Sequence, residues 1–283
     1  MAVALVFPGQ GSQRLGMLDA LTGRPGFIRL LDAAEALSGL DLRAVASQGT
    51  DAQLADTRAA QPLLYLADWA WGAAALAAGI RPAAVAGHSL GELAALAIAG
   101  VYSVEAGLEL VVERSRLMAE CAAASPGTMA AVLGMDSDAI RVATASIDGV
   151  WVANDNSPGQ VVVSGTVAGV TAAQDALLAA GARRVIPLPV AGGFHTPLMR
   201  PAADAFRDIL ESTSFADASV PVYSNTAPHA SVDAGALRER LATQMVSPVR
   251  WTETIAALRA DGVATLLEAG PGAVLTGLAK RTD

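Results

Sequence analysis

The sequence predicts an α/β protein, in which a body with a mostly parallel sheet carries a smaller inserted α+β unit. Short β-type runs alternate with helical runs along most of the chain, which is the order of elements in α/β folds. The middle of the chain follows a different order. The 283 residues, 53% of them hydrophobic, suffice for a main domain with a smaller one inserted into it.

The elements of the body are short apolar runs separated by longer helical runs. The β-type runs are Val3–Phe7, Ala83–Ala86, Val220–Tyr223 and Thr265–Glu268. The helical runs cover residues 26–38, 61–79, 89–99, 104–124, 201–212, 234–245 and 251–260. This alternation predicts helices packed on a mostly parallel sheet.

The middle of the chain reads as a second, smaller unit. Its β-type runs are Thr128–Leu133, Val150–Asn154, Gln160–Ser164 and Arg184–Pro189, and its helical runs are 136–146 and 167–181. The order β-α-β-β-α-β is the ferredoxin-like arrangement. We therefore expect a ferredoxin-like subdomain at residues 126–192, inserted into a body of residues 1–125 and 193–283. One continuous domain is the alternative.

Composition excludes several classes of function. The net charge of −8 and the isoelectric point near 4.9 disfavour a nucleic-acid partner. No run of eighteen or more apolar residues is free of polar breaks, so no membrane span is expected. The single Cys121 rules out an intramolecular disulfide framework and indicates the reducing cytoplasm. No Cys/His cluster has zinc spacing, so no metal is expected.

The stretch Gly87-His88-Ser89-Leu90-Gly91 is the most informative in the chain. An apolar run leads into it and a helical run of small residues follows. A serine flanked by glycines on a strand-to-helix turn has the geometry of a nucleophile elbow. The helix N-terminus behind it supplies free N–H groups where an oxyanion would form. The alternative is a chance motif in a chain rich in glycine and alanine.

Three histidines are candidate bases for Ser89. We expect His88, its sequence neighbour, to support the elbow as a packed or hydrogen-bonding residue. His229 lies in a polar loop and reads as a surface residue. His195 lies in a turn rich in glycine and proline at the expected subdomain boundary, where it could face the elbow across a cleft.

An arginine lies on the wrong face of the predicted helix 104–124. Arg114 falls on the apolar stripe of Leu110, Val111, Met118 and Cys121. A buried guanidinium needs an anion. That anion is either a core Asp or Glu, or the carboxylate of a substrate held by two parallel N–H bonds. The second reading gains weight if Arg114 and Ser89 share a cleft.

A glycine-rich loop, Phe7-Pro8-Gly9-Gln10-Gly11-Ser12-Gln13, follows the first predicted strand. Its glycines let backbone N–H groups approach a ligand. Sites of open α/β sheets lie beyond the carboxyl ends of the strands, where both this loop and Ser89 are expected. A plain turn is the alternative.

Together these residues resemble the malonyl-CoA:acyl carrier protein transacylase family, which includes the enzyme of fatty-acid synthesis and the free-standing acyltransferases of polyketide pathways. The similarity runs from about Val3 to Arg281. Its motifs are the loop 7–13, Gln61-Pro62, Gly87–Glu92, Arg114 with Met118, residues 127–131, Asn156–Gln160, Gly193–Pro197, Ser247–Trp251, Gly270–Gly272 and Leu275–Leu278.

The resemblance implies a hydrolase-like α/β body and a ferredoxin-like subdomain with the site between them. It implies Ser89 as nucleophile, His195 as base, and the backbone N–H groups of Gln10 and Leu90 as the oxyanion hole. Arg114 would grip a malonyl carboxylate. A main-chain carbonyl near Arg250 would orient the histidine, so no aspartate is needed. The other implied substrate contacts are Met118, Phe194, Gln61 and Asn156.

The resemblance also implies a ping-pong acyl transfer. The acyl group would pass from a coenzyme A thioester, bound as substrate, to the phosphopantetheine thiol of an acyl carrier protein, without a permanently bound cofactor. Carrier proteins are usually acidic, so docking calls for a local basic patch. The candidates are Arg183, Arg184, Arg200 and Arg250.

Three alternatives to this function stay open. A serine hydrolase or thioesterase would need a third, acidic triad member, and Asp136, Asp138, Asp148, Asp155 and Asp175 lie between Ser89 and His195. A substituted malonyl group as substrate is the second alternative. Gly193 stands where malonyl-specific members usually carry alanine and the missing methyl could widen the pocket slightly, but one methylene shifts selectivity by only about 1–3 kcal/mol, so Gly193 does not itself indicate a larger acyl group. A non-catalytic scaffold is the third.

Overall fold

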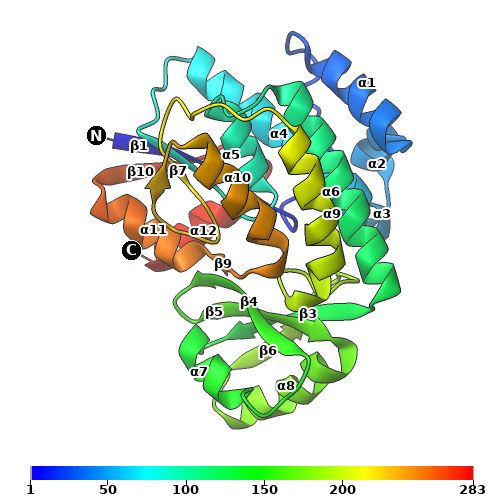
Figure 1. Cartoon of the computed structure of the whole chain (residues 1–283), viewed down its shortest axis with the longest axis vertical. Helices are drawn as coiled ribbons and strands as arrows, with labels where there is room; N and C mark the ends of the chain where they lie inside the picture. The colour runs from blue at the N-terminus through cyan, green and yellow to red at the C-terminus, as the bar shows by residue number, and fades with distance from the viewer. Residues whose placement is uncertain (1, 283) are drawn as a thin grey trace.

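The computed structural model describes residues 2–282, and its two five-stranded sheets confirm the α/β class (Figure 1). The first sheet has the order β10-β1-β2-β7-β8, in which all neighbours are parallel except β7 and β8. Its strands are β1 (Ala2–Phe7), β2 (Ala84–Gly87), β7 (Val222–Tyr223), β8 (Ala230–Ser231) and β10 (Val263–Glu268). The sheet is thus mostly parallel, as the sequence predicts.

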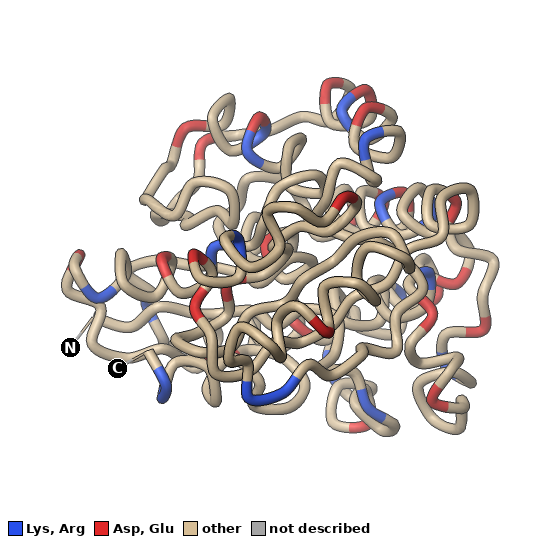
Figure 2. The backbone as a smooth tube through the Cα atoms, turned by 90° about the horizontal axis from the view of Figure 1, so that it is seen from below, with Lys and Arg blue, Asp and Glu red and all other residues tan. Residues whose placement is uncertain are grey.

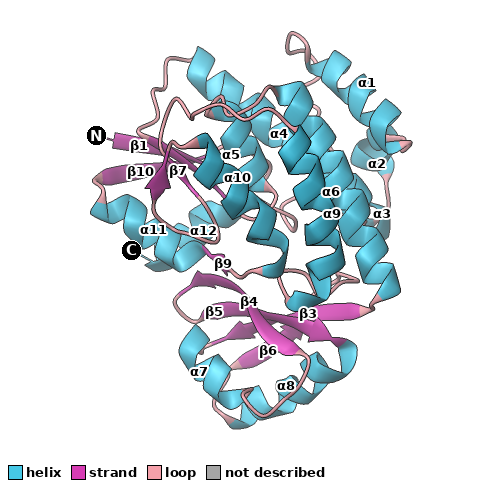
Figure 3. Ribbon diagram, in the orientation of Figure 1, coloured by secondary structure: helices cyan, strands magenta, loops and turns pink. Residues whose placement is uncertain are grey.

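Helices cover both faces of this sheet, which explains why β1 is an unbroken apolar run. Leu5 and Phe7 belong to one buried cluster, whereas Ala4 and Val6 belong to the other. The first face carries α1, α4, α5, α6 and α9, and the second carries α11 and α12 (Figure 3).

The helices of the body confirm the predicted runs and add three short ones. Their bounds are α1 Phe27–Ser38, α2 Leu42–Gln48, α3 Asp51–Ala55, α4 Thr57–Ala77, α5 Gly91–Ile98, α6 Val104–Ala124, α9 Arg200–Ser212, α10 Ala234–Thr243, α11 Trp251–Ala260 and α12 Val274–Thr282. Two short 3₁₀ turns are η1, Pro197–Met199, and η2, Gln244–Val246. Helices α2, α3 and α12 were not expected from the sequence. No helix of the described residues has the length and apolarity needed to cross a membrane.

The second sheet has the order β6-β3-β5-β4-β9. Its first four strands are antiparallel neighbours and, with α7 and α8, form the predicted ferredoxin-like arrangement. The elements are β3 (Gly127–Leu133), α7 (Ser137–Ala143), β4 (Val150–Ser157), β5 (Gln160–Thr166), α8 (Val167–Ala179) and β6 (Arg184–Pro187). Alternate residues point to opposite faces. Val161 and Val163 therefore pack with α7 and α8, whereas Met129 and Val162 join the core of the body.

A strand from the body completes this second sheet. Strand β9 (Val249–Arg250) pairs in parallel with Asn154 and Asp155 of β4. Next to it, the Thr252 hydroxyl donates to the Asp155 carboxylate at 2.7 Å. The body and the smaller unit therefore share a sheet, a connection that the sequence did not predict.

Candidate active site

Ser89 stands on the turn between β2 and α5 and has a φ of 51°, in the left-handed region. This conformation is uncommon for a residue with a side chain and marks a strained functional turn. A Cβ at Gly87 would lie 1.9 Å from the carbonyl carbon of Gly91, and one at Gly91 would lie 2.0 Å from the Phe7 oxygen. The flanking glycines are therefore required, and the geometry is that of a nucleophile elbow.

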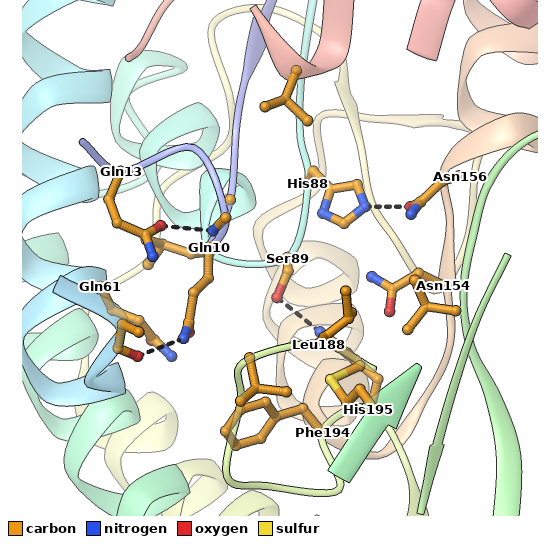
Figure 4. Close-up of a pocket in the computed structure, with 18 of the residues that line it drawn as sticks. Gln10, Gln13, Gln61, His88, Ser89, Asn154, Asn156, Leu188, Phe194 and His195 are labelled. Carbon is orange, nitrogen blue, oxygen red and sulfur yellow. Dashed lines mark hydrogen bonds between the residues drawn. The ribbon is translucent and has the colours of Figure 1, made fainter. Parts of the chain in front are cut away.

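His195 meets Ser89 across the cavity (Figure 4). The Ser89 Oγ lies 2.8 Å from the His195 Nε2. On the other side of the ring, Nδ1 lies 3.0 Å from the Gln244 carbonyl oxygen and 3.2 Å from that of Ser247. Carbonyl oxygens only accept, so the proton is on Nδ1 and Nε2 is free to accept from Ser89.

The expectation that Arg250 orients His195 is wrong. The chain turns at η2, so the carbonyls of Gln244 and Ser247 face the imidazole. Arg250 lies farther on, in β9, where its carbonyl accepts from Thr254 and its side chain pairs with Glu253.

His195 is almost completely buried. Burial above all, and then the positive charge of Arg114, lower the pKa of His195 from 6.5 to about 3. The imidazole is therefore neutral near pH 7, the form that a base requires.

Arg114 is 1% exposed and ends beside the nucleophile. Its Nη1 donates to the Gln61 side-chain oxygen at 2.7 Å, and its Nη2 donates to the Gln244 side-chain oxygen at 2.8 Å. The same Nη2 lies 3.3 Å from the Ser89 Oγ.

No ion pair involves Arg114 within the described residues. The internal salt bridge that the sequence left open is therefore not formed. Burial lowers the pKa of Arg114 to about 10, while the charge of Glu92 opposes that shift. The guanidinium is a buried cation held by neutral amides, and it shares a cavity with Ser89.

The expected oxyanion donors also border the cavity. Leu90 precedes the first turn of α5, and Gln10 lies in the loop after β1. Among the described residues, neither backbone N–H donates a hydrogen bond to another protein group. Both N–H groups are thus available to a ligand.

One cavity of about 240 Å³ brings the expected site residues together. It is lined by Gln10, Gln61, Ser89, Leu90, Arg114, Met118, Asn156, Phe194 and His195, with His88, Gln13, Met129, Val162, Leu188 and Val190 among the other contributors. Elements far apart in the sequence meet here, which is why the loop after β1 and the elbow share a site.

The other two histidines lie where the sequence predicts. The His88 Nε2 lies 2.7 Å from the Asn156 side-chain oxygen (Figure 4), and the His88 ring packs edge-on against Trp251. His88 therefore braces the elbow against β4. His229 is exposed and contacts Arg240.

The sequence missed three buried polar residues. Gln244 contacts Arg114 through its side chain and His195 through its carbonyl. The Asn225 side-chain oxygen accepts from the Ser89 N–H at 2.6 Å. Glu92 accepts from both Gln244 and Asn225. The available signal was Glu92, a charge inside a run of small helical residues.

A catalytic aspartate is absent from the described site. Within the described residues, none of the five aspartates between Ser89 and His195 forms a hydrogen bond or an ion pair with the histidine. Asp155, for example, contacts Ser137 and Thr252. The described residues likewise hold no group of His, Cys, Asp and Glu side chains that could bind a metal ion.

Gly193 does not widen the cavity in the way that the sequence suggested. A Cβ at Gly193 would lie 2.7 Å from the Leu198 side chain and 3.1 Å from the Gly165 oxygen. Gly193 is not among the residues that line the cavity. Its missing methyl therefore makes room for close packing with η1 and β5, not for a larger acyl group.

The four arginines proposed for docking do not behave alike. Arg183 and Arg184 are exposed, whereas Arg200 faces Asp204 at 3.8 Å and Arg250 pairs with Glu253 at 2.5 Å. Charged residues of both signs are scattered along the chain in Figure 2. Of the four, Arg183 and Arg184 are the better candidates for contact with an acidic partner.

Comparisons with known proteins agree with this geometry. The family model described as "Acyl transferase domain" matches residues 4–282. The malonyl CoA-acyl carrier protein transacylase of Bacillus subtilis is 41% identical over 99% of this chain and 90% of its own length.

Solved structures give the same result. The malonyl-CoA:ACP transacylase of Synechocystis superposes with a TM-score of 0.92 at 43% identity, covering 100% of this chain and 94% of that one. A malonyl-transacylase solved in complex with its type II PKS acyl-carrier protein gives a TM-score of 0.94 at 41% identity, covering 100% and 93%. The chain therefore belongs to the acyl transferase domain family, among the malonyl CoA-acyl carrier protein transacylases.

Proposed function

We propose that the chain transfers a malonyl group from coenzyme A to the phosphopantetheine thiol of an acyl carrier protein, with Ser89 and His195 as a catalytic dyad. One observation carries the proposal: the Arg114 cation is buried without a carboxylate partner, and its Nη2 lies 3.3 Å from the Ser89 Oγ. An acyl group with a free carboxylate satisfies that cation while its thioester carbon faces the serine.

The short distance between Arg114 and Ser89 also favours a short diacid. The reacting carbonyl must lie at the Ser89 Oγ while the carboxylate lies at the guanidinium. These two protein groups are already in contact, so one carbon between carbonyl and carboxylate suits the site better than a longer chain.

In the first half-reaction, Ser89 attacks the thioester carbonyl carbon as its hydroxyl proton passes to the His195 Nε2. The tetrahedral oxyanion is held by the backbone N–H groups of Gln10 and Leu90. The C–S bond then breaks, the coenzyme A sulfur takes the proton from His195, and the malonyl ester of Ser89 remains.

In the second half-reaction, His195 takes the proton of the carrier thiol, and the sulfur attacks the ester carbonyl carbon. The C–O bond to Ser89 breaks and the serine oxygen recovers the proton. Met118, Phe194, Gln61 and Asn156 would line the path of the acyl group, since all four border the cavity. The relatives named as transacylases, one of them solved with a carrier protein, support the choice of donor and acceptor.

A serine hydrolase is the second candidate because the elbow and the histidine would serve it equally well. Two carbonyl oxygens, not a carboxylate, face the His195 Nδ1. The imidazolium forms in transfer and in hydrolysis alike, so these contacts do not separate the two reactions. We rank transfer above hydrolysis because the relatives are named as transacylases, and the assay described next separates the two reactions.

The test is the intact mass of the protein after incubation with malonyl-CoA, followed by addition of a holo carrier protein. The wild type is expected to gain one malonyl group and pass it to the carrier. Ser89→Ala is expected to gain none, and an undiminished adduct would refute the nucleophile assignment. Release of free malonate, unaffected by the carrier, would instead identify a hydrolase.

We further propose the residue ranges of the body and the subdomain, and the cellular location of the protein. Residues 126–192 form the subdomain, and residues 1–125 and 193–283 form the body. The single cysteine supports a cytoplasmic location, and the chemistry above needs no permanently bound cofactor.

A further inference from the structure

One buried carboxylate, that of Glu92, is linked through Gln244 and Asn225 to the residues proposed to act in catalysis and binding. These are Ser89, His195 and Arg114. Glu92 lies in the first turn of α5, three residues after the nucleophile, and is 1% exposed. Its Oε2 accepts from the Gln244 side-chain Nε2 at 2.7 Å and from the Asn225 backbone N–H at 3.0 Å.

Gln244 is the first of these two connections. Because its Nε2 donates to Glu92, its side-chain oxygen must face the opposite way, where it accepts from the Arg114 Nη2 at 2.8 Å. The same Nε2 donates to the Ser89 carbonyl at 3.0 Å, and the Gln244 carbonyl faces the His195 Nδ1. The side-chain amide of Gln244 therefore orients Arg114, whereas the contact with His195 comes from the backbone carbonyl in η2.

Asn225 is the second connection. Its side-chain oxygen accepts from the Ser89 N–H at 2.6 Å, and its Nδ2 donates to the Gly87 carbonyl at 2.5 Å. The side chain thus grips the strained turn on both sides of His88. Neither of these two side-chain hydrogen bonds involves Glu92.

The negative charge of Glu92 lies near Arg114 but does not contact it. It favours the cationic form of Arg114, yet one amide separates the two groups and no ion pair forms between them. A carboxylate in direct contact would occupy the edge of the guanidinium that a substrate needs.

We propose that Glu92 is a positioning residue that fixes the direction of the Gln244 amide and thereby aims Arg114 at the carboxylate of the acyl substrate. This inference rests on the proposed function. Its core is geometric: an acceptor at the Oε2 position, not a negative charge as such, is what Gln244 requires.

Two substitutions separate this role from a general effect on folding. Glu92→Gln keeps an acceptor oxygen and the same size, whereas Glu92→Met keeps the length and removes the acceptor. Glu109→Gln on α6, an exposed position, is the matched control. The readouts are the rates of malonyl and acetyl adduct formation on the enzyme, and thermal unfolding.

We expect Glu92→Met to reduce kcat/KM for malonyl-CoA by about tenfold or more, mainly through KM, because the acceptor that directs the Gln244 amide toward Arg114 is lost. Acetyl adduct formation should fall much less, since Asn225 still holds the turn. Glu92→Gln should restore most of the malonyl rate. Equal losses for both acyl groups, or a Glu92→Gln variant as impaired as Glu92→Met, would overturn the inference.

A crystal structure of Glu92→Met tests the same inference without any activity. The Gln244 amide is expected to leave Arg114, and an unchanged contact between them would refute the positioning role. A wild type that forms no malonyl adduct would instead count against the proposed function, so the two failures are distinguishable.

Discussion

Arg114 links the sequence pattern to substrate chemistry at the scale of the residue. The side chain lies on a buried helical face, and its guanidinium receives only amide and hydroxyl partners. Burying a cation in this way costs several kcal/mol unless an anion arrives. A bound carboxylate would therefore offset the free-energy cost of burying the Arg114 cation, and this offset favours binding of the substrate.

Arg114→Ala should lower kcat/KM for malonyl-CoA by about tenfold to a hundredfold and that for acetyl-CoA far less, because only the malonyl group offers a charged partner. Arg116→Ala is the matched control, since Arg116 lies on the same helix but is half-exposed and paired with Glu113 and Glu120. Steady-state kinetics with both donors measure the difference. Parallel losses would mean that Arg114 serves the fold alone.

His195 makes stability depend on pH in a defined direction. Its pKa is about 3 in the folded protein against an ordinary 6.5, so between these values the unfolded chain binds the extra proton. Stability should therefore fall as the pH drops from 6.5 toward 3, by about 1.4 kcal/mol per pH unit for this group. Urea unfolding at several pH values, compared between wild type and His195→Asn, measures it, with His229→Asn as the exposed control. Equal slopes for wild type and His195→Asn would contradict the assignment.

Residue chemistry was predictable where a local pattern encodes it. Ser89 stands in a five-residue motif, and His195 is one of only three histidines. Gln244 and Asn225 were not predictable, because their partners Glu92, Arg114 and Ser89 lie more than a hundred positions away in the chain. Arg250 was misassigned for the same reason: which carbonyl reaches an imidazole depends on how a distant turn folds.

At the scale of the element, the elbow depends on close packing between β1, β2 and α5. Gly91→Ala should destabilise the protein by about 3 kcal/mol or more, because the added Cβ would lie 2.0 Å from the backbone oxygen of Phe7. Thermal or urea unfolding measures it, together with loss of the malonyl adduct.

Gly277→Ala is the matched control for that substitution. Gly277 lies within α12, and a Cβ there meets nothing within 4 Å. The change should stabilise the protein by about 0.5–1 kcal/mol, since alanine is the better helix former. Similar losses at both glycines would show that the elbow is not specially constrained.

Among the elements, the long amphipathic or apolar runs were predicted within a few residues, as β1, α6 and α9 show. Several short ones, among them β9 and α3, were not. Strand β9 has two residues and forms only because β4 offers an open edge, and α3 is five residues held by a Thr50–Gln53 capping box. Such segments have too little periodicity of their own to be recognised.

At the scale of the whole molecule, the two sheets behave as one structure. Strand β9, which follows from the body, is an edge strand of the second sheet, and the contacts of Thr252 with Asp155 and of His88 with Asn156 join the body to the smaller unit. The free energy of opening that hydrogen exchange reports should therefore be the same for the backbone amides of β3 and β5 as for those of β1 and β2. Native-state hydrogen exchange at increasing urea measures this. Earlier opening of the second sheet would show that it unfolds alone.

The path of the chain from Gln244 to Arg250 has a consequence for recombination between relatives. This segment first supplies the carbonyls that face His195 and then becomes an edge strand of the second sheet. A graft of residues 126–192 from another family member would therefore receive a foreign edge strand, and any misfit there would shift the catalytic imidazole. A working chimera should therefore exchange two segments together, residues 126–192 and residues 244–250.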